Sequence, residues 1–307
     1  MRAVRRISPG IVEVRDVEAR TPAPGEVLVD VEYAGVNPFD AQVLRGEIGP
    51  DPAAELTLGA EASGRVDGRL VLVSGGVGAA RDGTFAAQVV VPESSVHTLP
   101  QDADARAVAT VGVAGKTAWR AVHQLARVTA DDVVLVLGSA GGVGAFAAQL
   151  ARNAGATVLA HTGSAGKADH LAGLGAEPVV GADPGAVVAA VRDRAVSVVL
   201  DPLGGDYVSS LLPVLAPGAR VVTYGVLAGR TTTIDLGVLY GRGIQLHGTS
   251  GGTTSPQEAA GALTGALDAV VTGAVRVDHE ALPLEDGPQA FARLAERSVL
   301  GKLLLRP

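Results

Sequence analysis

The stretch VVLVLGSAGGVGAFAAQLARNAG at residues 133–155 decides the fold. Its nearly unbroken Val and Leu run is typical of a strand covered on both faces of a parallel sheet. A glycine-rich turn follows, and then an Ala-rich segment in which Phe146 and Leu150 are spaced to face the sheet, before Gly155 ends it. A strand, a glycine turn and a helix in this order predict a pyrophosphate site, because a helix N-terminus offers free N–H groups and a positive dipole end.

The glycine spacing departs from the standard dinucleotide fingerprint. Gly138, Gly141 and Gly144 form G-x-x-G-x-x-G, and Ser139 stands in the first glycine position of G-x-G-x-x-G. Such a motif is weak alone, but here it opens a series in which strands alternate with helices, which predicts a doubly wound parallel sheet of the Rossmann type. We expect its strands at residues 131–138, 156–163, 177–181, 196–205, 219–225 and 244–250.

A similar string, LVLVSGGVG, occupies residues 70–78. Gly83 interrupts the chain soon afterwards, and residues 84–91 then have a strand pattern, so no helix can follow this turn. We therefore predict that residues 74–83 form a hairpin or barrel loop. The pyrophosphate is assigned to the later turn, with Ser139, Ala140, Gly141, Gly142, Val143 and Gly144 as binding residues.

The first third of the chain has β character. Residues 25–35, GEVLVDVEYAG, alternate in the manner of a half-buried strand, and further short apolar runs are separated by Gly and Pro. This pattern predicts a small β barrel or sandwich. We expect residues 1–109 and 254–307 to form this domain, and residues 110–253 to form the dinucleotide-binding domain between them.

The end of the second Rossmann strand indicates which dinucleotide is bound. An acid there would hydrogen-bond the adenosine ribose of NAD, but this strand ends at His161 and is followed by Thr162, Gly163, Ser164 and, one turn on, Lys167. Hydroxyl and ammonium groups favour a ribose 2′-phosphate, so the predicted cofactor is NADP(H). The alternative is that Lys167 is a solvated helix residue and that His161 merely ends a strand.

Composition excludes several classes of protein. The 307 residues carry a net charge of −7, which argues against nucleic acid as the main partner, and they include no cysteine, which removes disulfides and Cys-based zinc sites. None of the six histidines has the spacing of a ligand pair, so we expect no metal. Without an apolar run of about 20 residues or a signal-peptide pattern, we expect a cytoplasmic chain with no membrane contact.

Several segments together resemble the medium-chain dehydrogenase/reductases, in their zinc-free quinone oxidoreductase (zeta-crystallin-like) branch. They are GEVLVDVEYAGVNPFDAQVLRG, LGAEASGRV, GKTAWRAV, the glycine-turn stretch, DPLGG and the closing GKLLLRP. The resemblance implies a GroES-like catalytic domain, NADPH, and a homodimer formed by pairing the Rossmann edge strand, for which residues 244–250 are the candidate. Gly59, Ala60 and Glu61 stand where zinc-dependent relatives carry Gly-His-Glu, which agrees with a metal-free enzyme.

The same resemblance implies further site residues. Asn37 would line the nicotinamide and substrate cleft, with Gln42 and Ile48 as cleft side chains, although Asn37 could instead stabilise a turn. Asp40 is expected to cap a short helix. Residues predicted to contact the cofactor are Thr117, Asp201, Leu203, Tyr224, Gly225, Gly248, Thr249 and Lys302. Three alternatives stay open. Asp201 could simply form a turn, and Lys302 could lie on the surface. Tyr224 is expected to pack under the nicotinamide, but its phenol could instead donate a proton.

These features predict direct hydride transfer from NADPH to a quinone or an α,β-unsaturated carbonyl compound. Negative charge developing on the carbonyl oxygen would be met by Asn37 or backbone N–H groups, and water would supply the proton. Two alternatives stay open. The first is an enoyl reductase acting on a thioester or secondary-metabolite intermediate. The second is a non-catalytic NADPH-binding sensor or partner-binding protein.

Overall fold

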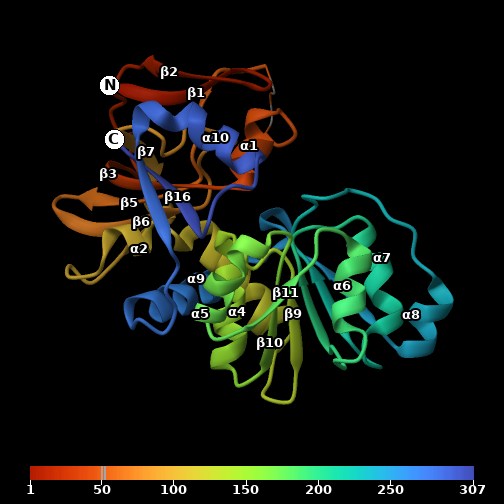
Figure 1. Cartoon of the computed structure of the whole chain (residues 1–307). Helices are drawn as coiled ribbons and strands as arrows, with labels where there is room; N and C mark the ends of the chain where they lie inside the picture. The colour runs from red at the N-terminus through yellow and green to blue at the C-terminus, as the bar shows by residue number, and fades with distance from the viewer. Residues whose placement is uncertain (50, 52) are drawn as a thin grey trace. The chain divides into compact units, whose positions relative to one another are not determined.

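The computed structural model describes residues 1–49, 51 and 53–307, which fold into two compact units (Figure 1). The first unit comprises residues 1–114 and 270–307, and the second comprises residues 115–269. The chain therefore leaves the first unit and later returns to it. The sequence predicts that the chain re-enters the first domain at residue 254. In the structure it does so at residue 270, and most of helix α9 (Pro256–Val271) belongs to the second unit.

The second unit is built on a six-stranded sheet in the order β11-β10-β9-β12-β13-β14, and every neighbouring pair is parallel. In chain order this is 3-2-1-4-5-6, the order of a doubly wound dinucleotide-binding sheet. The predicted Rossmann fold is confirmed, and each of the six predicted strand segments contains one observed strand. Their bounds are β9 Val133–Val136, β10 Thr157–Thr162, β11 Glu177–Val180, β12 Val198–Asp201, β13 Arg220–Thr223 and β14 Gln245–Gly248.

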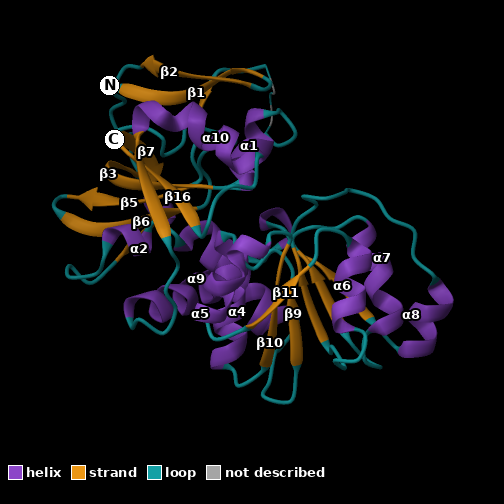
Figure 2. Ribbon diagram, viewed as in Figure 1, coloured by secondary structure: helices purple, strands orange, loops and turns teal. Residues whose placement is uncertain are grey.

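Helices cover both faces of this sheet, with α4 on one face and α6 and α7 on the other (Figure 2). The strands bury their Val and Leu side chains against these helices; Leu135, Leu159 and Leu200 are completely buried. The helices of the unit are α3 Lys116–Trp119, α4 Gly142–Asn153, α5 Ala168–Gly173, α6 Pro184–Val191, α7 Asp206–Leu211, α8 Leu236–Arg242 and α9. Before and after α3 the chain winds into the wider π-helical turns η2 (Val111–Gly115) and η3 (Arg120–Leu125).

The first unit is mainly antiparallel β structure. One sheet has the order β15-β16-β3-β5-β6-β8 with β7 also pairing with β3, and a smaller sheet has the order β2-β1-β4. The strands are β1 Arg2–Ser8, β2 Ile11–Asp16, β3 Glu26–Val36, β4 Leu56–Thr57, β5 Glu61–Val66, β6 Arg69–Ser74, β7 Gln88–Pro92, β8 Val96–Thr98, β15 His279–Pro283 and β16 Lys302–Arg306. The predicted fold class, a Rossmann sheet joined to a GroES-like β domain, is thereby confirmed.

Three short helices accompany these strands, namely α1 Pro38–Leu44, α2 Ala105–Val108 and α10 Gly287–Ala295. The core includes Leu58, Phe85 and Leu303, and the rings of Phe85 and Phe291 meet edge to face at 6.2 Å between centroids. No helix within residues 1–49, 51 and 53–307 is long and apolar enough to cross a membrane.

The look-alike glycine string lies in this first unit, and the prediction that it forms a loop is confirmed. After β6 the chain passes through bends, and no helix follows Gly78. A Cβ atom on Gly78 would lie 2.4 Å from the carbonyl oxygen of Gly59, and one on Gly83 would lie 2.2 Å from the same oxygen. These glycines therefore permit two backbone segments of the β domain to pack closely.

Candidate functional site

The turn between β9 and α4 has a shape that requires glycine. Gly138 has φ +63°, in the left-handed region, and Gly141 precedes the first residue of α4. A Cβ atom on Gly144 would lie 2.4 Å from the carbonyl oxygen of Gly138 and 2.6 Å from the Cα atom of Ser139. The helix N-terminus can thus tuck against the turn only when residue 144 has no side chain. This is the cradle that a dinucleotide pyrophosphate needs.

Ser139 and His161 hold the turn in place from behind. The Ser139 N–H donates to the carbonyl of His161 at 2.8 Å, and the Ser139 hydroxyl donates to the carbonyl of Val136 at 2.7 Å. The Gly138 N–H donates to His161 Nδ1 at 3.3 Å, so the imidazole proton is on Nε2, which donates to the carbonyl of Gly181 at 2.9 Å. Both side chains are buried and already bonded within the chain, so they shape the turn.

The pKa of His161 gives a testable pH dependence. Burial disfavours the charged imidazolium and lowers this pKa below the usual 6.5, although the hydrogen bond to the Gly181 carbonyl opposes the shift. An unfolded chain binds this proton at a higher pH than the folded one, so the stability of the second unit should decrease as the pH falls below about 6.5. Thermal unfolding from pH 8 to pH 5 measures this. A His161→Gln variant should show a shallower decrease, whereas His279→Gln, in the first unit, should match the parent; equal slopes in all three would contradict the assignment.

Polar groups gather where β10 ends. The Thr162 hydroxyl accepts a hydrogen bond from the Ser164 N–H at 3.2 Å, and a short 3-10 turn, η4 (Ala165–Lys167), leads into α5. Gly163 and Ser164 are exposed, and Lys167 is half-buried, which lowers the pKa of its ammonium. No carboxylate occurs between residues 161 and 167. The edge beside the glycine turn thus presents hydroxyl and ammonium groups, as a 2′-phosphate would require.

Asp201 shapes the turn after β12. Its carboxylate is completely buried and accepts hydrogen bonds from the N–H groups of Leu203 (2.7 Å) and Gly204 (2.9 Å) and from the Thr223 hydroxyl (3.0 Å). Burial raises its pKa. These contacts support the turn-forming alternative for Asp201, and they hold Leu203 at the carboxyl edge of the sheet.

Tyr224 and Gly225 follow β13. The Tyr224 hydroxyl is buried with no hydrogen-bond partner among the residues that the structure describes, and burial together with the nearby Asp201 carboxylate raises its pKa. This placement fits the packing role better than proton donation. A Cβ atom on Gly225 would lie 2.6 Å from the carbonyl oxygen of Pro202, so Gly225 lets the turns after β12 and β13 pack together.

Thr117, Gly248 and Thr249 belong to the same unit. Thr117 lies on α3, Gly248 ends β14, and the Thr249 hydroxyl accepts a hydrogen bond from Arg120 Nε at 2.7 Å. Sequence reasoning did not single out Arg120. Its signal is faint, since an arginine within a helical segment is ordinarily a solvated residue.

The first unit contains a buried polar cluster formed by Asn37, Asp40, Glu61 and Lys302. Lys302 Nζ contacts Asn37 Oδ1 at 2.5 Å and also forms an ion pair with Glu61 Oε1. Asn37 Nδ2 donates to Glu61 Oε1 at 2.8 Å and to the carbonyl of Gly35 at 3.1 Å. The remaining carboxylate oxygen of Glu61 accepts from the Val113 N–H at 2.8 Å.

This cluster changes the interpretation of two predicted residues. The alternative that Lys302 is a surface lysine is wrong, because the residue is 3% exposed, and its ammonium is engaged by Glu61 rather than presented to a phosphate. Asn37 is 2% exposed, and both of its amide hydrogens are donated within the unit. In this arrangement the amide has no hydrogen left for a substrate oxygen.

Asp40 lies in the first turn of α1, whose N-cap residue is Asn37, so it supports the start of the helix from within rather than preceding it. Its Oδ2 atom accepts from the Asn37 N–H at 2.8 Å. Its Oδ1 atom is buried without a hydrogen-bond partner in the described chain, and burial, opposed by that hydrogen bond, raises the pKa of Asp40 to about 7. Gln42 is half-buried on α1, and Ile48 packs against the edge of the first unit's core.

Sequence reasoning noted Glu61 only as part of Gly-Ala-Glu. The available signal was two charged residues at strand starts, since Glu61 begins β5 and Lys302 begins the Leu-rich strand β16. In the part of the chain that the structure describes, no group of three or more His, Asp or Glu side chains could hold a metal ion.

Comparison with known proteins agrees with this geometry. The family model described as zinc-binding dehydrogenase matches residues 142–267, and that of the alcohol dehydrogenase GroES-like domain matches residues 23–69. A quinone oxidoreductase of Rattus norvegicus is 30% identical over 244 residues, which cover 73% of each chain. Part of a polyketide synthase, GfsB of Streptomyces halstedii, is 36% identical over 206 residues, covering 66% of this chain and 4% of that protein.

A solved structure extends the likeness to the whole chain. A mycobacterial protein complexed with NADPH has a TM-score of 0.88 and 25% identity, with 100% of both chains covered. Three findings indicate the same family. They are the matched family models, the relative that is 30% identical over 73% of each chain, and the Rossmann sheet joined to a GroES-like domain. The chain belongs to the medium-chain dehydrogenase/reductase superfamily, and quinone oxidoreductases are among its relatives.

Proposed function

We propose that the protein is an NADPH-dependent oxidoreductase that reduces quinones or α,β-unsaturated carbonyl compounds without a catalytic metal. The observation that carries this proposal is the glycine turn at residues 138–144, whose Gly144 cradle a Cβ atom would fill. In a family of oxidoreductases, such a turn is expected to hold the pyrophosphate of the dinucleotide. The reaction class is inferred from the quinone oxidoreductase relatives.

The chain's own residues fit NADP(H). Backbone N–H groups at the start of α4 would hold the pyrophosphate, and Thr162, Ser164 and Lys167 would surround the 2′-phosphate. The turns that contain Leu203, Gly225 and Thr249 would support the other half of the dinucleotide. When bound, NADP(H) supplies a hydride. The metal-free character is inferred from the donor set, because the chain has no cysteine and carries Ala60 where zinc-dependent relatives have histidine.

The protein's contribution to the reaction is expected to be positioning. Since the Asn37 amide is bonded to Glu61 and Gly35, we infer that backbone N–H groups meet the charge that develops on the substrate oxygen. The Tyr224 hydroxyl is buried and has no hydrogen-bond partner within the described residues, so water is the proposed proton source. Correct placement of the hydride donor and acceptor then supplies most of the rate.

Steady-state NADPH oxidation with quinones, enones and enoyl thioesters tests the proposal. Turnover with quinones or simple enones is the expected result. Tight NADPH binding with no turnover on any of these substrates would refute it and would favour a sensor or partner-binding protein. A second candidate, reduction of an enoyl thioester or a secondary-metabolite intermediate, is favoured by the 36% identity with part of a polyketide synthase. Turnover restricted to enoyl thioesters would select this second candidate.

Cofactor preference depends on Lys167 in this proposal. Lys167→Ala should weaken NADPH binding by about tenfold, because one charge-assisted contact with the 2′-phosphate is lost, and should leave NADH binding unchanged. Dissociation constants from fluorescence titration provide the measurement. Asp169→Asn, two residues on and exposed, is the matched control. A parent chain that binds NADH and NADPH equally well would contradict the phosphate assignment.

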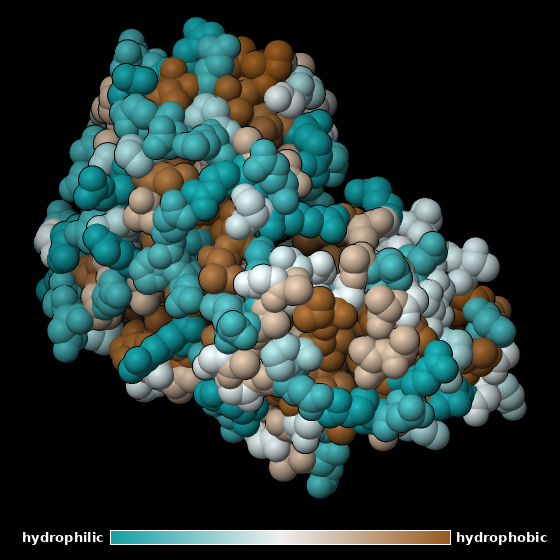
Figure 3. All heavy atoms as spheres, in the orientation of Figure 1, coloured by the Kyte–Doolittle hydropathy of each residue, from teal (hydrophilic) through white to brown (hydrophobic). Residues whose placement is uncertain are grey.

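We also propose that two copies associate through β14. This strand pairs with β13 on one side, and the nearby apolar side chains Leu246, Leu236 and Tyr240 are 40%, 70% and 90% exposed. Apolar surface is visible over the α8 region in Figure 3. An exposed strand edge next to apolar side chains is a ready site for strand pairing.

The mass of the particle in solution tests this association. Light scattering should give a dimer for the parent chain and a monomer for the double variant Leu236→Glu with Tyr240→Glu, because each new carboxylate would have to be buried in the interface. Ile11→Glu introduces a charge at another exposed apolar position, 52% exposed in the first unit, and should leave the dimer intact. A monomeric parent would disprove the proposal.

A further inference from the structure

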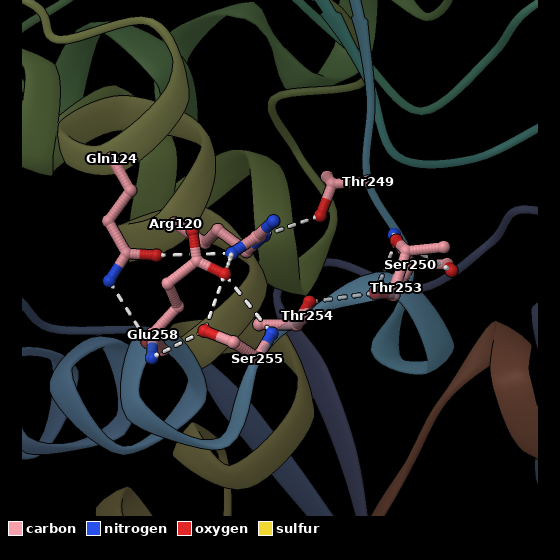
Figure 4. A network of polar contacts seen from close by, with 8 residues as sticks. All are labelled: Arg120, Gln124, Thr249, Ser250, Thr253, Thr254, Ser255 and Glu258. Atoms are coloured by element: carbon pink, nitrogen blue, oxygen red, sulfur yellow. Dashed lines mark hydrogen bonds and ion pairs between the residues drawn. The ribbon is translucent and has the colours of Figure 1, made fainter.

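A buried arginine in the second unit contacts both ends of one loop (Figure 4). Arg120, the first residue of η3, is 8% exposed. Its Nε atom donates to the Thr249 hydroxyl at 2.7 Å, at the start of the loop. One of its terminal nitrogens lies 3.3 Å from Glu258 Oε2, just past the loop's end, and 3.4 Å from Gln124 Oε1. A single guanidinium therefore contacts two residues, Thr249 and Glu258, that lie 129 and 138 positions after Arg120 in the sequence.

The end of the loop is fixed to α9 by a second set of contacts. Glu258 Oε2 also accepts hydrogen bonds from the Ser255 N–H at 3.1 Å and the Ser255 hydroxyl at 2.8 Å. Gln124 Nε2 donates to the Glu258 carbonyl at 2.9 Å. Hydrogen bonds from Ser255 and Arg120 lower the pKa of Glu258, so this carboxylate stays charged beside the guanidinium.

The loop itself, residues 249–255, is rich in hydroxyl groups that bond to one another. The Thr254 hydroxyl donates to the Ser250 carbonyl at 2.8 Å, and Ser250 and Thr253 bond through their side chains at 3.3 Å. At its start the Thr249 N–H donates to the Thr223 carbonyl at 3.0 Å. The contacts within the loop are local, and Arg120 supplies the side-chain contacts that join the loop's start at Thr249 and its end at Glu258 to η3.

The topology places this loop beside one half of a bound dinucleotide. In the proposed function the pyrophosphate lies at the turn after β9, and the 2′-phosphate lies beside Ser164 and Lys167 after β10. The nicotinamide half must then extend in the opposite direction, over the carboxyl ends of β12, β13 and β14. The loop at residues 249–255 begins at the carboxyl end of β14.

We propose that Arg120 is a positioning residue for the nicotinamide half of the cofactor, acting through the loop at residues 249–255. This inference rests on the proposed function. A planar guanidinium suits the task, because its fixed donors engage Thr249 and Glu258 from one buried position, which a lysine ammonium cannot reproduce. Arg120 is not expected to contact the cofactor itself.

The experiment compares NADPH with adenosine 2′,5′-bisphosphate, which lacks the nicotinamide half. Dissociation constants for both ligands and kcat are measured for the parent, Arg120→Met and Thr249→Val. In Arg120→Met, NADPH binding should weaken by about tenfold and kcat should fall by up to about 10²-fold through misplacement of the reacting group. Binding of the bisphosphate should stay within about twofold of the parent, since the adenosine side is untouched. Thr249→Val should change the same quantities in the same direction but less.

Arg220→Met is the matched control, because Arg220 is a second poorly exposed arginine of the same unit. It lies at the amino ends of the strands, where it pairs with Asp132 and donates to the Ala126 carbonyl at 2.6 Å. It should lower stability without changing the ratio of the two dissociation constants. If Arg120→Met does not fold, the two dissociation constants are compared in Thr249→Val, which retains the arginine and its contact with Glu258.

Two results would overturn the inference. One is an equal loss of affinity for NADPH and the bisphosphate, which would indicate general destabilisation. The other is a folded Arg120 or Thr249 variant with unchanged NADPH affinity and kcat. Failure of the proposed function is distinguishable, because it would show in the parent chain as an absence of NADPH-dependent turnover.

Discussion

Lys302→Met is expected to lower the free energy of unfolding of the first unit by about 3–5 kcal/mol. Glu61 is completely buried, and the substitution removes the ammonium that pairs with its carboxylate, while Asn37 loses the donor to its Oδ1 atom. The linked carboxyl of Asp40, whose pKa the buried site raises to about 7, lies in the same cluster. Urea unfolding followed by circular dichroism measures the change.

Two further variants separate this effect from ordinary loss of a side chain. Adding Glu61→Gln to Lys302→Met removes the uncompensated charge, so the double variant should recover a large part of the lost stability. Arg293→Met breaks an exposed ion pair with Glu280 and should cost at most about 1 kcal/mol. A Lys302→Met chain as stable as the Arg293→Met chain would show that the buried pair does not stabilise the unit.

Gly144→Ala is expected to abolish tight NADPH binding. The new methyl group would lie 2.4 Å from the Gly138 carbonyl oxygen and 2.6 Å from the Ser139 Cα atom, both of them backbone atoms that cannot rotate away. The turn must open to admit it, and the N–H groups of α4 then no longer converge on a phosphate. We expect an increase in the NADPH dissociation constant of at least about 10²-fold, because hydrogen bonds to a charged phosphate contribute about 1.5–3 kcal/mol each and more than one is lost. Isothermal titration calorimetry gives the constant.

Gly78→Ala is the matched control for this substitution. Its methyl group would also lie 2.4 Å from a backbone carbonyl, that of Gly59, but within the look-alike loop of the first unit. It should reduce stability by about 1–3 kcal/mol and leave the NADPH affinity of the folded protein unchanged. If both alanine variants lost NADPH affinity equally, the assignment of the pyrophosphate to residues 138–144 would be wrong.

The Rossmann sheet could be predicted because its signal is local. Strands buried on both faces need continuous Val and Leu runs, as at residues 133–137, and helices must fill the intervals between parallel strands. The same local logic separated the two glycine strings, since a helix can follow Gly144 but not Gly78. Strand boundaries were harder to predict. Residues 84–91 have a strand pattern, yet β7 begins at Gln88, because the Phe85 backbone bonds instead to Leu58 and Val4.

The polar contacts could not be predicted, because they join distant parts of the chain. Glu61 and Lys302 are 241 positions apart, and Arg120 and Thr249 are 129 apart. Nothing in a single sequence shows that β5 and β16 both lie next to β3, which is what brings Glu61 and Lys302 to Asn37. Asn37 was therefore predicted to line the substrate cleft or to stabilise a turn, whereas the folded chain bonds its amide to Glu61 and Gly35.

The return of the chain to the first unit determines the order in which the two units can complete their folding during synthesis. Strand β16 pairs with β3 through Val36, Gly35 and Ala34, and it carries the ammonium that neutralises Glu61. While the ribosome is still adding residues 115–269, the early β strands lack both that neighbour and that charge. The second unit can fold on the nascent chain, whereas the first unit can complete its sheet and pair Glu61 with Lys302 only after residues 302–306 emerge. The N-terminal segment is thus synthesised first, but the unit to which it belongs completes its folding last.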